Sequence, residues 1–351
     1  ILIPRCTWMT TASLGVLKSG AAYQPLDPSY PPERLEFMIA DAGVKLVIAD
    51  ETLLGRIPGY KGPVATLKEL EDSSLESQVS RSLPQDAFII LYTSGSTGKP
   101  KGAVLEHGNL MAFCAFHRKE IGLDGASRSA AYASYGFDAN MMDQYPVLTA
   151  GGTLYIIDES IRLDLAKIDE YFCANGITHA FMTTQVGRQY AQVATAKTLK
   201  WLGVGGEALV PLEPPKGFRL ANIYGPTETT VYVTSQQVDR FFRHMPIGRP
   251  LDNVRAYVVD KRGRRLPPGV PGELWIAGPQ VSRGYLNNPE KTAAAFGPNP
   301  FAPSGAGDCD RVYKTGDIVK FLPDGTIMFV GRRDGQVKVR GFRIELSEVE
   351  E

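Results

Sequence analysis

The sequence predicts an α/β fold made of doubly wound βαβ units, followed by a smaller antiparallel β region. Helix-like and strand-like segments alternate up to about residue 230, which indicates parallel strands connected by helices. Beyond that point, short strand-like segments are separated by turn sequences at residues 260–263 and 323–325, with no long helix between them. We therefore expect an α/β part over about 1–230 and a β-rich part over about 231–333.

The first elements follow from apolar spacing and from the positions of proline and glycine. Apolar residues at helical spacing predict a helix over residues 9–20, which a glycine would cap, and another over 32–42, with a proline near its start. Short strands are expected at 22–28 and 45–49. Residues 54–85 mix glycine, proline, serine and charged residues, so we expect a loop-rich connection there.

The later elements continue the alternation. An apolar run over residues 87–92 predicts a buried strand. The helices expected after it are 108–114, 141–148 and 164–175; the α/β strands are 129–134, 153–157, 177–182, 200–206 and 220–224; the antiparallel strands are 231–238, 254–259, 272–277 and 326–330.

Composition excludes several classes of function. The 351 residues include 38 Lys+Arg and 38 Asp+Glu, so charge favours neither nucleic acid nor an anionic membrane as a partner. No apolar run reaches the roughly 20 residues that span a bilayer. The four scattered cysteines show no disulfide or metal spacing, and no basic segment follows the first residue, so we expect no signal peptide and a cytoplasmic location. Both ends are expected to be cuts in a longer polypeptide.

Residues 93–102, directly after the first long apolar strand, have the composition of a polyphosphate-binding loop. Glycines let a backbone approach a ligand closely, hydroxyl and amide groups donate to phosphate oxygens, and lysines neutralise charge. It is not a Walker A loop, because Gly95 and Gly98 are too close together and Pro100 would interrupt the helix that such a loop opens. Composition alone leaves a flexible surface loop as the alternative.

Charged and aromatic side chains beside turns form further candidates. Glu228 could hold Mg²⁺ and Tyr224 could stack on a base, against the alternative of a solvated turn. Asp317 follows a tight glycine turn and is suited to accept hydrogen bonds from ribose hydroxyls, although such turns are also common without function. Arg332 lies in a segment that otherwise predicts a charged surface turn.

Asp138 is unusual because apolar residues surround it in the sequence. A buried carboxylate must find a partner, and the ammonium group of a ligand would be one. An Asx turn or a helix N-cap is the alternative. The four histidines show no spacing with acids or thiols, so the sequence predicts no hydrolase triad.

The order of these motifs along the whole chain closely resembles the adenylate-forming superfamily, in particular the amino-acid adenylation domains of nonribosomal peptide synthetases. The motifs that carry the resemblance are residues 17–27, 91–102, 137–139, 222–229, 272–274, 283–285, 313–317 and 331–345. The resemblance implies that an amino-acid carboxylate attacks the α-phosphorus of ATP, with Mg²⁺ as the metal. The phosphopantetheine thiol of a peptidyl carrier protein then takes the aminoacyl group, and further synthetase domains are expected as partners.

The resemblance also assigns roles to residues. Lys101, Thr97 and Glu228 would be catalytic, with Glu228 holding Mg²⁺ and Lys101 stabilising charge. Tyr224 would stack on adenine, Asp317 would bind the ribose hydroxyls, and Arg332 would reach the ribose or phosphates. The remaining ATP-binding positions would be Thr93, Ser94, Gly95, Ser96, Gly98, Gly206, Glu207, Ala208, Asn222, Gly225, Thr227 and Phe329, the last standing where the family often has a tyrosine.

By the same resemblance, Asp138 would anchor the α-amino group of the substrate. The other pocket positions would be Ala139, Met142, Phe181, Gly203, Gly205, Ile223, Val231 and Tyr232. All are apolar or glycine apart from one phenolic hydroxyl, so a polar substrate side chain would lack partners there. We expect a hydrophobic amino acid, with the two glycines leaving room for a branched or aromatic side chain.

Domain organisation and rival functions follow from the same resemblance. The large core would cover 1–333, shortened at its N-terminus, with Asp334 as the hinge and 334–351 as the start of a small α+β lid. The late lysine of that lid is absent, so we expect this chain to adenylate weakly. The alternatives are a D-alanine–carrier protein ligase, an acyl- or aryl-CoA synthetase, which Asp138 disfavours, and an inactive nucleotide-binding module.

Overall fold

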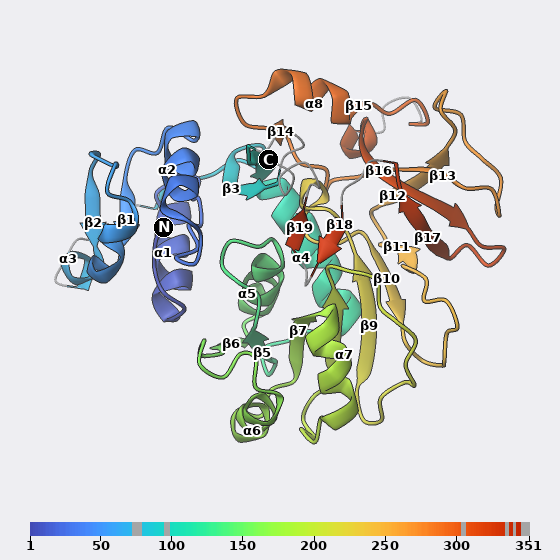
Figure 1. Cartoon of the computed structure of the whole chain (residues 1–351), viewed down its shortest axis with the longest axis horizontal. Helices are drawn as coiled ribbons and strands as arrows, with labels where there is room; N and C mark the ends of the chain where they lie inside the picture. The colour runs from blue at the N-terminus through green and yellow to red at the C-terminus, as the bar shows by residue number, and fades with distance from the viewer. Residues whose placement is uncertain (72–78, 95–98, 303–306, 334–336, 340–341, 345–351) are drawn as a thin grey trace.

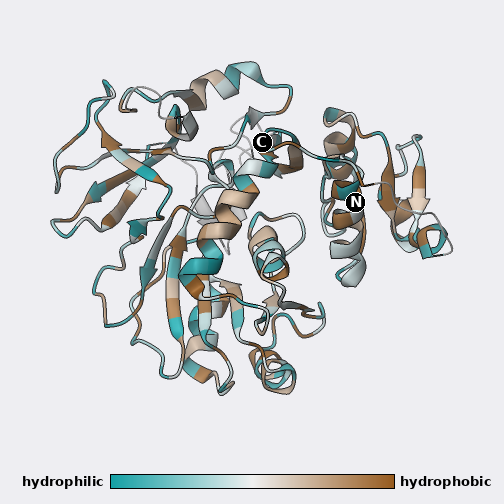
Figure 2. Ribbon diagram, turned by 180° about the vertical axis from the view of Figure 1, so that it is seen from behind, coloured by the Kyte–Doolittle hydropathy of each residue, from teal (hydrophilic) through white to brown (hydrophobic). Residues whose placement is uncertain are grey.

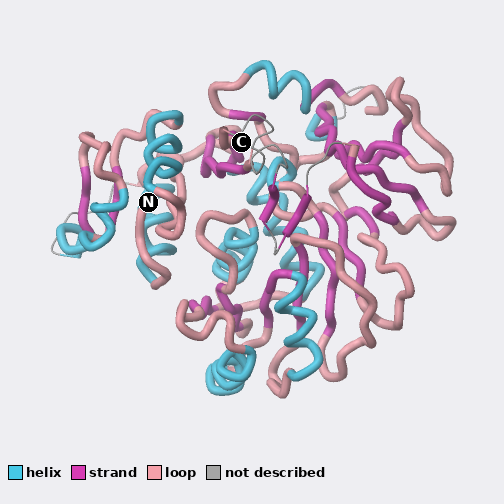
Figure 3. The backbone as a smooth tube through the Cα atoms, in the orientation of Figure 1, coloured by secondary structure: helices cyan, strands magenta, loops and turns pink. Residues whose placement is uncertain are grey.

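The computed structural model describes residues 1–71, 79–94, 99–302, 307–333, 337–339 and 342–344. Within these residues the strands form five sheets, the largest of them seven-stranded and mainly parallel (Figures 1 and 3). The mixed α/β class agrees with the expectation from sequence. The predicted positions Gly95, Ser96, Thr97, Gly98 and Asp334 lie outside the described residues.

The N-terminal elements form a unit beside the rest of the molecule, at the left of Figure 1. They are α1 (Thr7–Lys18), α2 (Pro32–Asp41), β1 (Val47–Ala49), η1 (Glu51–Arg56), β2 (Val64–Thr66) and α3 (Leu67–Glu71), with β1 parallel to β2. Two expectations were wrong. Residues 22–28 make only an isolated bridge at Tyr23, because the prolines at 25 and 28 lack the N–H that a strand ladder requires, and the connection 54–85 contains β2 and α3.

The seven-stranded sheet occupies the lower centre of Figure 1, with strand order β11-β10-β9-β8-β7-β5-β6. Its strands β5 to β9 pair in parallel, and β10 pairs antiparallel with β9. The elements here are β5 (Arg128–Ala131), α5 (Ala139–Thr149), β6 (Thr153–Ile156), α6 (Leu165–Asn175), β7 (His179–Thr183), α7 (Thr184–Val193), β8 (Trp201–Gly205), β9 (Arg219–Tyr224), η2 (Thr227–Thr229), β10 (Thr234–Gln237) and β11 (Arg249–Pro250). This is the βαβ part that the sequence predicts.

The predicted phosphate loop joins two antiparallel strands. The strand before it, β3 (Ala87–Thr93), pairs with β4 (Lys101–Glu106), which the sequence analysis did not predict, and β4 leads into α4 (His107–Ile121). The third strand of this small sheet is β14 (Gly284–Tyr285), with Tyr285 opposite Ala103. A distant part of the chain thereby comes close to Lys101.

The β-rich part forms an antiparallel sheet at the right of Figure 1, with strand order β12-β13-β16-β15 and β17 paired with β16. Its elements are β12 (Arg255–Val259), β13 (Gly272–Ala277), α8 (Pro289–Ala295), β15 (Phe296–Pro298), η3 (Gly307–Cys309), β16 (Arg311–Phe321) and β17 (Ile327–Arg332). Residues 313–317, expected as a turn, lie inside β16. Gly316 adopts φ 73° and the ladder shifts its register just beyond Asp317, as at a bulge. Beyond this sheet, β18 (Val337–Val339) pairs with β19 (Phe342–Ile344).

The core consists of three clusters of buried apolar side chains. The largest fills the space between the seven-stranded sheet, α4, α5 and the small β3–β4 sheet. Figure 2 shows apolar residues along the strands of the seven-stranded sheet. In the described part of the chain, every helix is too short or too polar to cross a membrane.

Candidate active site

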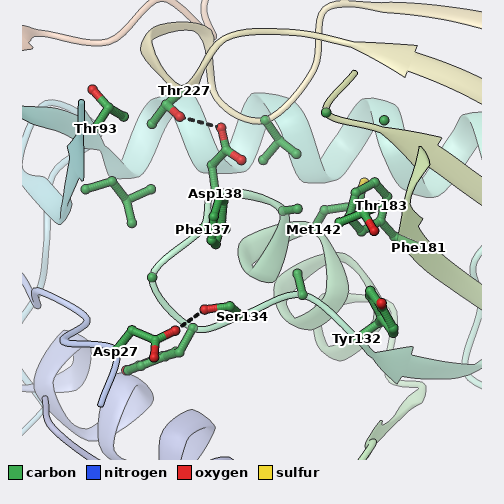
Figure 4. A pocket seen from close by; sticks show the side chains of 18 of the residues that line it. Asp27, Thr93, Tyr132, Ser134, Phe137, Asp138, Met142, Phe181, Thr183 and Thr227 are labelled. Carbon is green, nitrogen blue, oxygen red and sulfur yellow. Dashed lines mark hydrogen bonds between the residues drawn. The ribbon is translucent and has the colours of Figure 1, made fainter. Parts of the chain in front are cut away.

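A cavity of about 1160 Å³ lies at the carboxyl ends of β7, β8 and β9. Ligands of parallel α/β sheets commonly bind at this edge, where the loops after successive strands converge. Thr183, Gly205 and Tyr224, the last residues of the three strands, all line the cavity. Figure 4 shows it from close by, with Thr93 on one side and Phe181 on the other.

A buried ionic cluster joins Lys101, Glu228 and Tyr285. The Lys101 Nζ lies 3.2 Å from Oε1 of Glu228, whose side chain is 0% exposed. It also donates to the Tyr285 hydroxyl at 2.9 Å and lies 4.3 Å from the centre of that ring. The Tyr285 hydroxyl donates to Oε1 of Glu228 at 2.7 Å. The lysine charge therefore compensates a carboxylate that has no contact with water.

A second polar cluster contains Asp317, Tyr224 and Arg332, all of which line the cavity. Arg332 donates through Nη1 to one carboxylate oxygen of Asp317 at 2.8 Å, and the Tyr224 hydroxyl donates to the other. Burial, and then the charge of Asp317, raise the pKa of Tyr224, which therefore remains a hydrogen-bond donor. An ionised carboxylate has about four acceptor positions, so Asp317 can also accept from a ligand hydroxyl.

Asp138 points into the cavity and toward the loop after β9 (Figure 4). It precedes α5 at the N-cap position, yet its side chain makes no capping hydrogen bond. Instead the Thr227 Oγ1 donates to Oδ2 of Asp138 at 2.6 Å. The cap alternative is therefore not supported, and the carboxylate faces the space beside the nucleotide-side residues.

Other predicted nucleotide positions differ in how they meet the cavity. Thr93 lines it, and its buried hydroxyl has no hydrogen-bond partner among the residues that the structure describes, which suits a group that binds a ligand oxygen. Ser94, Gly206, Gly225 and Thr227 also line the cavity. Gly225 is required by crowding, since a Cβ there would lie 2.3 Å from the Cα of Tyr232.

Besides Lys101 and Glu228, four predicted nucleotide positions in the described part of the chain are not among the residues that line the cavity: Glu207, Ala208, Asn222 and Phe329. Glu207 is hydrogen-bonded through its backbone to Thr184, and Asn222 donates to the Pro246 carbonyl at 2.9 Å. Phe329 lies on β17 opposite Val319. Their assignment to the nucleotide stays a prediction.

Apolar side chains form one further part of the cavity wall, while another part carries charged residues such as Asp27, Glu159 and Arg162. The lining residues of this half are Ala139, Met142, Phe181, Gly205, Ile223, Val231 and Tyr232. The Tyr232 hydroxyl, the one polar group predicted here, is bonded to Nδ1 of His117 at 2.7 Å in the core. Burial, and then the neighbouring His179, lower the pKa of His117 to about 3, so the ring is neutral at ordinary pH.

A strained turn carries Val231 and Tyr232 to the cavity. Thr230 and Val231 adopt φ 58° and 71°, values that β-branched residues rarely take. The buried Gln280 holds this turn, because its amide donates to the carbonyls of Thr229, Thr230 and Tyr232. The Thr230 hydroxyl donates back to the Gln280 carbonyl at 2.8 Å. The apolar wall is thus set by a rigid backbone.

One expectation about the pocket was wrong. We expected Gly203 and Gly205 to leave empty room, but the Trp201 ring fills the space at Gly203, and Gly205, which does line the cavity, is crowded by Ile223. A Cβ on Gly203 would lie 2.2 Å from the Trp201 ring, and a Cβ on Gly205 would lie 2.9 Å from Cγ1 of Ile223. Gly203 is accordingly absent from the residues that line the cavity.

Comparison with known proteins identifies the family. The family model described as AMP-binding enzyme matches residues 1–286. The chain belongs to the AMP-binding enzyme family. Over its full length it is 40% identical to part of bacitracin synthase 1 of Bacillus licheniformis, and over 97% of its length 40% identical to part of surfactin synthase subunit 2 of Bacillus subtilis (strain 168). The chain spans only 7% and 10% of these relatives.

A solved structure supports the same assignment. A four-domain nonribosomal peptide synthetase bound to AMP and glycine superposes with a TM-score of 0.83 and 29% identity, covering 99% of this chain and 26% of that one. The resemblance to nonribosomal peptide synthetase adenylation domains drawn from the motifs is thereby confirmed, as is the α/β fold class.

The residues present also fit the Mg²⁺ that the family implies. Mg²⁺ usually takes one or two protein carboxylates and completes its shell with water and substrate phosphates. Glu228 can supply such a carboxylate, and the described residues contain no cluster of three or more His, Cys, Asp and Glu that would form an all-protein cage. Lys101 neutralises that carboxylate in this structure.

The sequence analysis assigned no role to three residues in or behind this site: Tyr285, His117 and Trp201. Tyr285 lay in a recognised motif, but its contact with Lys101 required the unpredicted strand β4. His117 and Trp201 are buried in the core behind the apolar wall, with ring centroids 5.4 Å apart. No motif in the sequence around His117 or Trp201 predicts a position behind the cavity.

Proposed function

We propose that this chain activates a hydrophobic amino acid with ATP, forming aminoacyl-AMP and pyrophosphate. The observation that carries the proposal is the position of Asp138. Its carboxylate lies at the boundary between the polar residues of the nucleotide side and an apolar wall formed by residues such as Met142 and Phe181. An ammonium group bound there would direct its side chain toward that wall.

The polar half supports the chemistry of adenylation. A substrate carboxylate oxygen forms a bond to the α-phosphorus while the bond to the pyrophosphate oxygen breaks, so negative charge must be neutralised and the groups held in line. Lys101 and Arg332 would supply positive charge, and Thr93 a hydroxyl donor. Asp317 would accept from the ribose hydroxyls, and Tyr224 would face the base. Bound Mg²⁺, held by Glu228, would stabilise the charge on the phosphates.

We further propose that the aminoacyl group then passes to the phosphopantetheine thiol of a peptidyl carrier protein, in a cytoplasmic multidomain synthetase. The similarity to bacitracin and surfactin synthases supports this step. Four free thiols, without a disulfide among them, are consistent with a reducing compartment. We propose that residues 1–333 form the core of this domain and that Asp334 is its hinge to the lid.

Amino-acid-dependent exchange of labelled pyrophosphate into ATP tests the proposal. The proteinogenic amino acids and D-alanine are compared on the full chain and on the chain extended through the lid. We expect exchange with one or a few apolar amino acids, weak in the shorter form. A preference for Asp, Lys or Ser would contradict the substrate class, and a tight preference for D-alanine would identify a D-alanine ligase. ATP binding without exchange in the extended chain would identify an inactive module.

A further inference from the structure

The face of the seven-stranded sheet below the cavity contains an unusual pair of residues. In the parallel register, Gly203 of β8 lies between Phe181 of β7 and Ala221 of β9, and Trp201 lies two residues earlier on the same strand. Residues two apart on a strand point to the same face of the sheet. Trp201 and Gly203 therefore share the face that continues, at Gly205, into the wall of the cavity.

The indole of Trp201 lies over the backbone of Gly203. A Cβ added to Gly203 would meet Cη2 of Trp201 at 2.2 Å, and both Cζ2 and Cζ3 at 2.9 Å. Real Cβ atoms do not approach other atoms that closely, so no other residue type fits at 203 while the ring is in place. The large and the small residue are complementary, and the ring takes the volume that a side chain at 203 would otherwise fill.

The ring is fixed in this position by its surroundings. Trp201 is 4% exposed. The His117 ring packs against it edge-to-face, with centroids 5.4 Å apart, and His117 also contacts Phe113 and Tyr232. Tyr232 and Phe181 line the cavity, so this aromatic cluster packs directly behind its apolar wall. Such a cluster cannot move aside without opening a void.

We propose that Trp201, a residue behind the pocket, limits the depth of the amino-acid side-chain pocket and selects aliphatic over aromatic substrates. The inference rests on the function proposed above. With Gly203 covered by the indole and the Tyr232 hydroxyl hydrogen-bonded to His117, this part of the cavity offers a shallow apolar wall without a polar partner. A branched aliphatic side chain fills such a space, whereas a phenyl or indole ring needs the volume that Trp201 occupies.

The test uses two probes that do not depend on catalysis. In leucyl- and phenylalanyl-sulfamoyl adenosine, a sulfamoyl group replaces the phosphate of the aminoacyl-adenylate. Calorimetry on the full chain gives the Kd of each. We expect the wild type to bind the leucyl probe at least about tenfold more tightly, since a misfit of even one methylene in an apolar pocket gives about 10- to 200-fold discrimination. Trp201→Leu is expected to remove or reverse this preference.

Matched variants separate pocket depth from damage to the fold. Trp275→Leu shortens a tryptophan on β13, outside the cavity, and should leave both Kd values unchanged. The Kd of AMP reports whether each variant is folded. Should Trp201→Leu fail to bind AMP, the milder Trp201→Phe decides, with the same direction expected. Gly203→Ala should weaken both probes, and Gly203→Ala combined with Trp201→Leu should recover leucyl binding.

The outcomes distinguish this inference from the proposed function. A wild type that binds AMP but neither probe would overturn both. Wild-type preference for the phenylalanyl probe would overturn the inference alone. So would an unchanged preference in a Trp201 variant that still binds AMP. A preference that shifts toward the phenylalanyl probe in the Trp201 variants and not in Trp275→Leu supports it.

Discussion

The two halves of the cavity are stabilised in different ways. On the nucleotide side, three carboxylates at or beside the cavity have donors from the protein: Glu228 from Lys101 and Tyr285, Asp317 from Arg332 and Tyr224, and Asp138 from Thr227. In the apolar half, the hydroxyl of Tyr232 is bonded to His117 in the core and away from the ligand space. The polar groups can therefore exchange a hydrogen bond within the protein for one to a ligand. The apolar half discriminates between ligands only by the size and shape of their side chains.

This difference determines how substitutions should act. In the polar half, removing one partner leaves a buried charge without compensation, which typically costs about 3 to 5 kcal/mol. In the apolar half, a change alters packed volume, and its effect depends on which side chain is bound.

Lys101→Met should have the largest effect. It leaves the fully buried Glu228 without its cation, so the free energy of unfolding should fall by roughly 3 to 5 kcal/mol, measured by urea denaturation. Adding Glu228→Gln should restore most of that stability, because the uncompensated charge is gone, while pyrophosphate exchange stays lost. If the double variant is no more stable than Lys101→Met, the pair is not the main source of stability at this site.

Asp138→Ala should chiefly affect recognition of the amino acid. Loss of a partner from a buried charge pair costs roughly 2 to 5 kcal/mol, or about 30-fold to several thousand-fold in the Kd of leucyl-sulfamoyl adenosine. The Kd of AMP should not change. The control is the same compound without its α-amino group. It should bind the wild type weakly, and the variant should bind it with the same Kd. An equal loss for both probes in the variant would show that Asp138 does not contact the ammonium.

The stability of the wild type should fall in mild acid because His117 is buried and neutral. Its pKa is lowered to about 3 from the ordinary value of 6.5, so between these values the unfolded chain binds a proton that the folded chain does not. Stability is full above pH 6.5 and decreases as the pH falls toward 3. Between pH 6.5 and 5 the loss is up to about 2 kcal/mol from this group.

His117→Leu should remove that part of the pH dependence. Urea denaturation at pH 7 and pH 5 measures it, and the difference between the two pH values should be smaller in the variant by up to about 2 kcal/mol. His179, whose pKa is also lowered by burial, to about 4, leaves a residual slope in both proteins. An unchanged difference would mean that His117 is protonated in the folded chain.

Tyr285→Phe should have the smallest effect. It removes the hydroxyl that bridges Lys101 and Glu228 but retains the ring, over which the lysine lies at 4.3 Å. The hydroxyl bonds two charged groups, but Lys101 and Glu228 stay paired without it, so the net cost should be about 1.5 kcal/mol and the exchange rate should fall by about tenfold. Tyr285→Ala, which also removes the ring, should lose more; equal losses would assign no role to the ring.

The polar half was the more predictable from sequence. Lys101, Asp138, Glu228, Asp317 and Arg332 were all singled out from local chemistry and from the family resemblance, and all but Lys101 and Glu228 line the cavity; those two lie together beside Tyr285. Local chemistry left an ordinary turn as the alternative for Glu228, Asp317 and Arg332, and the order of the motifs along the chain decided between the two interpretations. Tyr285 was missed as a partner because only the pairing of β14 with β4 brings it to Lys101.

The apolar half and several strands were less predictable. Strand periodicity places Trp201 and Gly203 on the same face of the sheet. It does not show that the indole lies along the strand and covers the glycine. Gly316 indicated a turn, whereas antiparallel neighbours on both sides hold it within β16 as a bulge. Packing and pairing with distant segments decide such features, and local patterns do not contain them.

Calorimetry of leucyl- and aspartyl-sulfamoyl adenosine on the full chain measures the side-chain selectivity of the cavity. The two probes share the nucleotide and the ammonium group, so both use the polar half equally and differ only in the apolar half. We predict that the leucyl probe binds about 30-fold more tightly or better, because a buried carboxylate without a partner costs at least about 2 kcal/mol. Equal or tighter binding of the aspartyl probe would contradict an apolar side-chain pocket.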